Sequence, residues 1–261
     1  MRRKTRQIVG LCGVVAGLFL SNPAAAEPAN DKVTCANASG DAAIAACGRA
    51  IASRKFKGID LAELHYNRGA EYAAKGECNR AIADYNVTIR LDPKSVSAYN
   101  NRGDCYMRQA LNLRALEDYA KAIELDPTDS RAYKNRGEAY ENLGQLDGAL
   151  EAYNDAVRID PKYSRGYFNR GNIFQKKGDF DRAIGEYTES IRLEPKYADA
   201  FNRRGIAHLR KGEYERAITD QTEAIRLNPK HGKAFNDRCW AATSLVEPCS
   251  RRSRIVTSRC V

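Results

Sequence analysis

Four asparagines recur with a constant spacing of 34 residues, and their side chains could hydrogen-bond to a peptide backbone. They are Asn67, Asn101, Asn135 and Asn169, and the next copy of the position holds Arg203. A carboxamide presents both a donor and an acceptor, which suits the two polar groups of a peptide unit. Duplication of a repeat would also multiply an asparagine that has no role in binding. The choice between these interpretations depends on the elements that position the side chains.

No group of residues indicates catalysis or metal binding. The histidines do not cluster with cysteines, no cysteine pair has C-x-x-C spacing, and no phosphate-binding loop or Ser/His/Asp set stands out. We interpret His65 and His208 as packing residues. Four carboxylates recur at one position and are interpreted as solvated helix faces: Asp84, Asp118, Glu186 and Asp220. The sequence therefore predicts a chain that is not an enzyme and uses no cofactor or metal.

Prolines share the 34-residue period over five copies, at Pro93, Pro127, Pro161, Pro195 and Pro229. A fixed period over this many copies indicates a repeat array. A single copy buries too little apolar surface to offset the entropy of ordering its backbone, so the copies must stack on one another. Arrays of this kind are typical of binding scaffolds.

The copy 130–163 has the pattern of a helix, a turn, a second helix and a stop. Gly144 ends the first helix, where a left-handed or unrestrained backbone is wanted. Pro161 ends the second, because proline lacks an N–H and biases the preceding residue away from helical angles. Residues at helical spacing mark one face of each helix: Tyr133, Gly137 and Tyr140 in the first, and Ala149, Tyr153 and Ala156 in the second.

This pattern of an aromatic residue, glycine and an aromatic residue, followed by alanine, an aromatic residue and proline, resembles the tetratricopeptide repeat. His65, His208 and Gln221 depart from it at three of the aromatic positions. The resemblance implies an all-α fold, a right-handed superhelical solenoid of antiparallel helix pairs, with first helices that line a concave groove. Five full copies match the pattern, at 62–95, 96–129, 130–163, 164–197 and 198–231.

The resemblance places the asparagine ladder in this groove, where it is similar to the ladder by which some family members hold the backbone of an extended peptide. Lys134, Arg165, Phe168 and Arg203 occupy further groove positions. The C-terminal half of the groove is richer in basic residues. We therefore expect it to bind a protein or peptide segment that is acidic or ends in a carboxylate.

The first 26 residues have the features of a secretory signal peptide. Basic residues precede an apolar run, Ile8 to Leu20, that is too short to span a bilayer well, and Ala26 ends a typical cleavage site. We expect a periplasmic or secreted protein with no membrane span after cleavage; an uncleaved anchor is the alternative. The whole chain carries +10 and the signal +4, which leaves +6, and nothing in this balance demands nucleic acid.

Residues 27–61 resemble half of a repeat that caps the array, with Cys47 at the usual aromatic position of a second helix. Cys35 lies twelve residues before Cys47, and in an oxidising compartment we expect a disulfide between them that holds the preceding segment on this helix. Two buried thiols are the alternative. Cys78 with Cys105 is a weaker candidate pair, and the pairing of Cys239, Cys249 and Cys260 is open.

A sixth copy begins at residue 232, and its pattern then stops. Residues 247–261 are basic and show no helical periodicity. The segment 232–261 is either a truncated sixth copy with a disordered basic tail or the product of a shifted reading frame.

These features together favour a non-catalytic adaptor that binds a protein segment in its concave groove. The alternative is a structural or assembly component of a cell-envelope complex that uses its convex face or its ends.

Overall fold

The computed structural model describes residues 28–246, and within them it has thirteen α-helices and no strand. The expected signal peptide and the basic tail lie outside the described residues. None of the described helices is long and apolar enough to cross a membrane. The helices are α1 (Pro28–Asn37), α2 (Gly40–Ala52), α3 (Gly58–Ala74), α4 (Cys78–Leu91), α5 (Val96–Arg108), α6 (Asn112–Leu125), α7 (Ser130–Asn142), α8 (Leu146–Ile159), α9 (Ser164–Lys176), α10 (Phe180–Leu193), α11 (Ala198–Lys211), α12 (Tyr214–Leu227) and α13 (Gly232–Val246).

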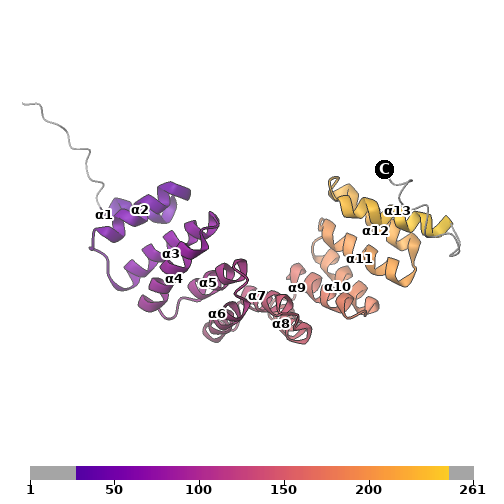
Figure 1. Cartoon of the computed structure of the whole chain (residues 1–261), viewed down its shortest axis with the longest axis horizontal. Helices are drawn as coiled ribbons and strands as arrows, with labels where there is room; N and C mark the ends of the chain where they lie inside the picture. Colours follow the sequence, from indigo (N-terminus) through magenta and orange to yellow (C-terminus); the bar gives the residue numbers. More distant parts are fainter. Residues whose placement is uncertain (1–27, 247–261) are drawn as a thin grey trace, which may run out of the picture.

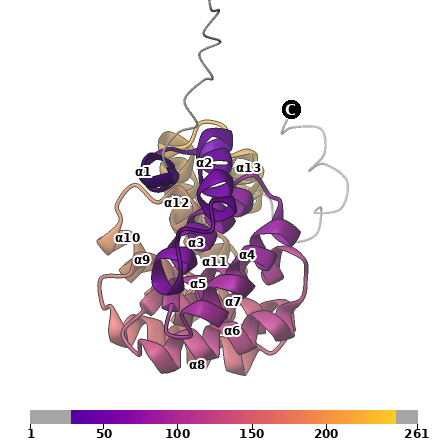
Figure 2. The same cartoon turned by 90° about the vertical axis from the view of Figure 1, so that its left-hand side faces the viewer.

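The helices pair and stack into one curved array (Figure 1). Each helix packs against the next one along the chain, both within a pair and between a second helix and the following first helix. Figures 1 and 2 show that the two ends of the array rise on the same side, with α8 at the bottom of the curve. The expected all-α solenoid of helix pairs is confirmed.

The first helix of each pair lies on the inner side of the curve. Neighbouring first helices contact each other directly, as α3 does with α5, α5 with α7, and α11 with α13. Among the described helices, no two neighbouring second helices make a contact of that extent. The first helices therefore form the more closely spaced row, and the array curves toward that row.

A tyrosine of the second helix packs on a glycine of the first helix and sets the separation of the two helices. A Cβ placed on Gly103 would lie 2.7 Å from the Tyr119 ring, and one on Gly137 would lie 2.5 Å from the Tyr153 ring. Real carbon atoms do not approach this closely, so only glycine permits the observed packing. The same contact joins Gly69 to Tyr85 and Gly171 to Tyr187.

The fifth pair replaces this tyrosine by a hydrogen-bonded glutamine. Gln221 is fully buried, and its Nε2 would lie 2.7 Å from a Cβ on Gly205. Asn202 donates from Nδ2 to Gln221 Oε1 at 2.7 Å, and Gln221 Nε2 donates to the Asn202 carbonyl at 3.2 Å. A buried carboxamide needs such partners, so this departure from the repeat pattern depends on Asn202.

The turn inside each pair needs one residue with a left-handed backbone. Gly144 has φ +73°, as the sequence predicts, and Gly76, Gly178 and Gly212 are similar. The corresponding residue of the second pair is Ala110, with φ +58°. A residue with a Cβ is disfavoured in this region by about 1–2 kcal/mol, so Ala110 is a strained position.

The N-terminal cap is itself a helix pair, of which the sequence pattern predicted only the second member. The segment before it forms α1, which packs on α2 and also contacts α3. A disulfide bond joins Cys35 of α1 to Cys47 of α2, and both residues are buried. Arg49 donates from Nη2 to the buried carboxylate of Asp31 at 2.6 Å. The disulfide and this ion pair attach α1 to α2, and Lys32 of α1 also pairs with Asp60 and Glu63 of α3.

Replacing both Cys35 and Cys47 by serine should loosen α1, because the disulfide closes a short loop and contributes about 3 kcal/mol. Hydrogen exchange read by mass spectrometry should show faster exchange in residues 28–52 and unchanged exchange in α11 and α12. Equal protection of α1 in the variant and the parent would contradict this role.

Ala110→Gly should stabilise the protein by about 0.5–1 kcal/mol, because it removes the left-handed strain at a small entropic cost. Gly144→Ala, at the same position of the next pair, should instead destabilise the protein. Urea unfolding of both variants measures the two effects, and a change of the same sign in both would refute the explanation.

Candidate functional site

An arginine on the first helix of a pair forms an ion pair with an acid on the second helix. Arg102 donates from Nε and Nη2 to the two carboxylate oxygens of Asp118 at 2.9 and 2.6 Å. Asp118 is only 4% exposed. The interpretation of these carboxylates as solvated faces is therefore wrong, because this position faces the arginine of the first helix. The same pairing joins Arg68 to Asp84, Arg170 to Glu186 and Arg204 to Asp220.

These arginines also connect each pair to the preceding one. Arg102 donates from Nη1 to Asn86 of α4 at 2.6 Å, and Arg204 donates to Thr188 of α10 at 3.0 Å. One guanidinium therefore joins three helices and helps to fix the angle between successive pairs. The sequence contains a pattern that predicts this ion pair. An arginine precedes each packing glycine, and in four copies an acidic residue follows that arginine by 16 positions.

The cations around each buried carboxylate decide the direction of its pKa. Burial raises the pKa of Asp118, and the single guanidinium of Arg102 does not offset the rise. Burial acts in the same sense on Asp84, but Arg68 and His65 together outweigh it and lower the pKa. His65 Nδ1 lies 2.8 Å from Asp84, so this histidine has a polar partner in addition to its packing. His208 is likewise buried, with Nδ1 2.7 Å from Glu213.

The third pair lacks the acid and neutralises its arginine less completely. Ala152 occupies the acid position, and Arg136 reaches Asp155 instead, at 3.2 Å. Nε of Arg136 is buried without a hydrogen bond to any described residue. This pair, α7 with α8, lies in the middle of the array (Figure 1).

On the inner side, the hydroxyl groups of three packed tyrosines bind polar side chains of the first helices, whereas that of Tyr85 is buried without a hydrogen bond to a described residue. Tyr119 donates to Asp104 at 2.7 Å, and Tyr153 donates to Glu141 at 3.1 Å. Tyr187 donates to Gln175 at 2.8 Å. The side chains that form the core therefore also organise the inner face, which the repeat pattern did not predict.

The four asparagines of the predicted ladder lie on first helices but differ in environment. Asn135 is 5% exposed and donates from Nδ2 to Asp104 at 2.8 Å. Asn101 donates to the Tyr66 hydroxyl and accepts from Arg131, both at 3.1 Å. Asn67 and Asn169 are half-buried and have no side-chain hydrogen bond to another described residue. Of the four, only Asn67 and Asn169 have both the donor and the acceptor of the carboxamide available to an external partner.

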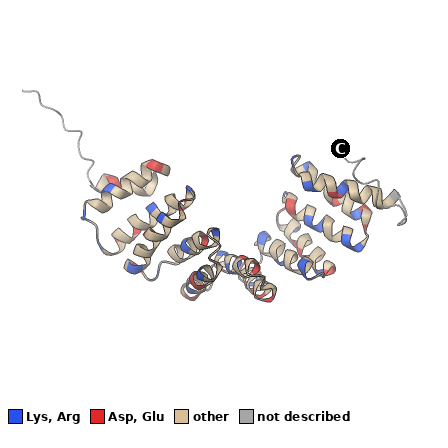
Figure 3. Ribbon diagram, viewed as in Figure 1, with Lys and Arg blue, Asp and Glu red and all other residues tan. Residues whose placement is uncertain are grey.

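The basic residues of the inner face fall into two groups. Lys134 is bonded to Glu138 at 3.0 Å, and Lys176 to Glu141 at 2.6 Å. Arg165 of α9 and Arg203 of α11 are exposed and form no ion pair with a described residue. Figure 3 shows both signs of charge along the whole array, so the absence of an ion pair, rather than charge density, separates these two arginines from Lys134 and Lys176.

Phe168 adds an aromatic surface beside the unpaired arginines. Its ring lies 5.8 Å from the Tyr187 ring and 4.9 Å from the Tyr197 ring, between centroids. Burial raises the pKa of Tyr197 to about 12, against the opposing charge of nearby Arg165. The charge of Arg203 likewise opposes the effect of burial, which raises the pKa of Tyr187. Phe168 therefore contacts both tyrosines, while Arg165 lies near Tyr197 and Arg203 near Tyr187. We call Phe168, Arg165 and Arg203 the Phe168 cluster.

The stacked pairs and their inner row of first helices define a helical repeat protein. Profiles of the tetratricopeptide repeat match residues 96–129, 119–151 and 168–231, and a TPR repeat profile matches 69–109 and 142–178. Together they cover residues 69–231 without a gap. The chain belongs to the tetratricopeptide repeat family, a class of scaffolds for protein interaction.

Solved structures of three other proteins have a similar fold. MamA is 26% identical with a TM-score of 0.58, over 66% of this chain and 94% of MamA. YrrB, described as a TPR protein with an unusual peptide-binding site, is 24% identical with a TM-score of 0.57, over 72% and 95% of the two chains. PilF of Pseudomonas aeruginosa is 19% identical with a TM-score of 0.65, over 73% and 87%. No curated protein matches the chain.

Asp118→Ala should destabilise the protein by about 3–5 kcal/mol, because it leaves the guanidinium of Arg102 partly buried without its acid. Glu124→Ala, on the same helix, breaks only the exposed pair with Lys121 and should cost less than about 1 kcal/mol. Chemical denaturation measures both variants. Similar losses of stability in the two variants would show that burial of the Arg102–Asp118 pair does not matter.

Proposed function

We propose that the chain is a non-catalytic adaptor that binds an extended acidic protein segment along its inner face. The family supports a role as an interaction scaffold. The observation that carries the acidic preference is the unpaired state of Arg165 and Arg203 beside Phe168.

The chemistry of the Phe168 cluster suits a carboxylate ligand. A guanidinium binds the two oxygens of a carboxylate through paired hydrogen bonds, whether that group is an acidic side chain or a chain terminus. Phe168 can cover an apolar side chain of the same ligand. Asn169, the next residue, offers a donor and an acceptor to the ligand backbone.

The N-terminal half of the inner face contributes less to charge selection, because its cations are already bonded. Arg131 donates to Asn101, and Lys134 to Glu138. A ligand would have to displace these contacts before it could use either cation. We therefore assign the preference for acidic segments to α9 and α11.

We also propose that the protein acts in the periplasm or after secretion. The basic start and apolar run of residues 1–26 support export. The disulfide between Cys35 and Cys47 agrees with an oxidising compartment, where such bonds persist.

An assembly role through the convex face or the ends is the second candidate. The exposed apolar side chains of Phe235, Trp240 and Leu245 on α13 favour it. This role would leave partner binding unchanged when the inner face is altered, so one set of variants separates the two functions.

Replacing both Arg165 and Arg203 by alanine should weaken binding of a glutamate-rich peptide about tenfold or more, because two charge-assisted contacts are lost. Fluorescence anisotropy with a labelled peptide measures the affinity. The binding of the parent protein should also fall with added salt, since exposed charges are screened over about 8 Å at physiological ionic strength.

The matched control replaces Arg192 and Arg226 by alanine, which removes the same charge from second helices. Both are exposed and paired with a glutamate three residues earlier. Equal weakening by the two double variants would indicate a general charge effect and reject the Phe168 cluster. Asn169→Ala should weaken binding further without loss of stability, since this side chain makes no internal hydrogen bond with a described residue.

A further inference from the structure

Two thiols meet at the junction between the first and second full helix pairs. Cys78 is the first residue of α4, and Cys105 lies on α5. Both are buried in one core cluster with Tyr72 and Tyr85. Both thiols are free rather than joined in a disulfide, and burial raises the pKa of Cys105. The structure therefore packs two thiols, 27 residues apart in sequence, into the same core cluster.

The later junctions show independently that these two positions face each other. Three of the four corresponding pairs also share one core cluster: Leu146 with Ile173, Phe180 with Ala207, and Tyr214 with Ala241. The second junction has Asn112 and Ala139 at these positions. Contact between the two positions is thus a property of the stacked repeat. Only the first junction fills both positions with cysteine.

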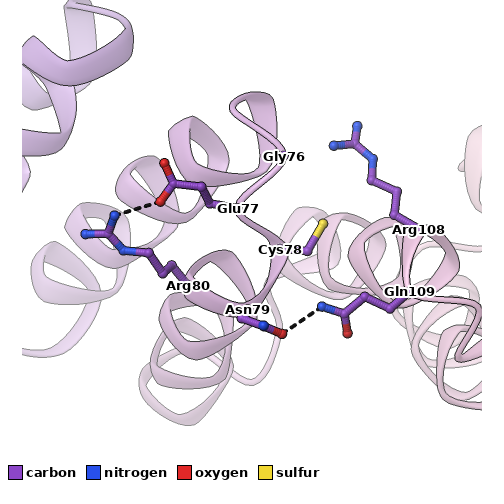
Figure 4. Close-up of a pocket in the computed structure, with 7 residues that line it drawn as sticks. All are labelled: Gly76, Glu77, Cys78, Asn79, Arg80, Arg108 and Gln109. Carbon is purple, nitrogen blue, oxygen red and sulfur yellow. Dashed lines mark hydrogen bonds and ion pairs between the residues drawn. The ribbon is translucent and has the colours of Figure 1, made fainter.

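A surface cleft reaches one of the two thiols. It has a volume of about 390 Å³ and lies between the Gly76–Arg80 turn and the end of α5. Figure 4 shows the Cys78 sulfur between the Gly76 turn and Arg108. Cys78 is 6% exposed and lines the cleft, whereas Cys105 is 1% exposed and does not. A reagent that enters the cleft therefore meets Cys78 first.

We propose that Cys78 and Cys105 form an oxidation site, at which exchange with a small disulfide creates a bond between α4 and α5. The Cys78 thiolate attacks one sulfur of the oxidant, which forms a mixed disulfide and releases one thiolate. Cys105 then loses its proton and attacks the Cys78 sulfur, which releases the second thiolate. The two protons of the protein thiols pass to the two leaving thiolates, and two electrons pass to the oxidant.

The bond would act on the array by joining the first full pair covalently to the second. The other contacts there include the hydrogen bond from Gln109 Nε2 to Asn79 at 2.8 Å and that from Arg108 to the Ala73 carbonyl at 2.6 Å. Oxidation would fix this junction, and with it the N-terminal end of the inner face, while the later junctions stay non-covalent.

The test treats the full chain, after complete reduction, with oxidised glutathione, then blocks free thiols with N-ethylmaleimide and digests without reductant. Trypsin should release Cys78 in the peptide 76–80 and Cys105 in the peptide 103–108. We expect these two peptides to appear linked, and to separate on reduction. The peptide 33–49 holds both Cys35 and Cys47 and reports whether oxidation occurred in the same sample.

Single variants distinguish the two steps. In Cys105→Ser, the peptide 76–80 should carry glutathione, because the second attack is removed. In Cys78→Ser, the peptide 103–108 should be recovered with N-ethylmaleimide alone. Recovery of both parent peptides as N-ethylmaleimide adducts, while Cys35 and Cys47 have reoxidised, would overturn the proposal. Linkage of either thiol to any other cysteine, or a mixed disulfide that persists on the parent Cys78, would overturn it as well.

Discussion

The structure depends on the contact between a tyrosine ring of each second helix and a glycine of its first helix. Because Gly103 and Gly137 have no Cβ, the rings of Tyr119 and Tyr153 fit between the helices. Their hydroxyl groups then reach polar side chains of the inner row. Helix separation and the polar pattern of the inner face therefore follow from the same side chain. This coupling explains why the core cannot be changed without an effect on the candidate groove.

The arginines of the chain divide into those that build the array and those available to a partner. A buried ion pair contributes little net stability, but it favours one geometry because each partner left alone is costly. Arg102 illustrates this role, since it binds Asp118 and also the preceding second helix. Arg165 and Arg203 have no such acid among the described residues and remain on the inner surface. The proposed preference for acidic segments depends on this second group.

Sequence reasoning succeeded where the cause of a structure is local. Gly144 and Pro161 mark a turn and a stop through backbone geometry alone, and the structure has both. It failed for α1, which has no apolar stripe and is attached through Cys35 and the ion pair of Asp31 with Arg49. It also failed for Asp118, because helical periodicity relates residues within one helix and not across a turn. The partner of this carboxylate lies on the other helix of the pair.

The sequence by itself determined the array, its helix pairs and the positions that recur on the first helices. These follow from a local pattern that is copied every 34 residues. Only the tertiary structure decided which recurring residues are available to a partner. Asn135 and Asn169 occupy the same position of successive repeats, yet Asn135 is bound to Asp104 and Asn169 has no side-chain hydrogen bond within residues 28–246. The difference arises because the partner of Asn135 is Asp104 of the preceding repeat, and the copied pattern leaves that position variable.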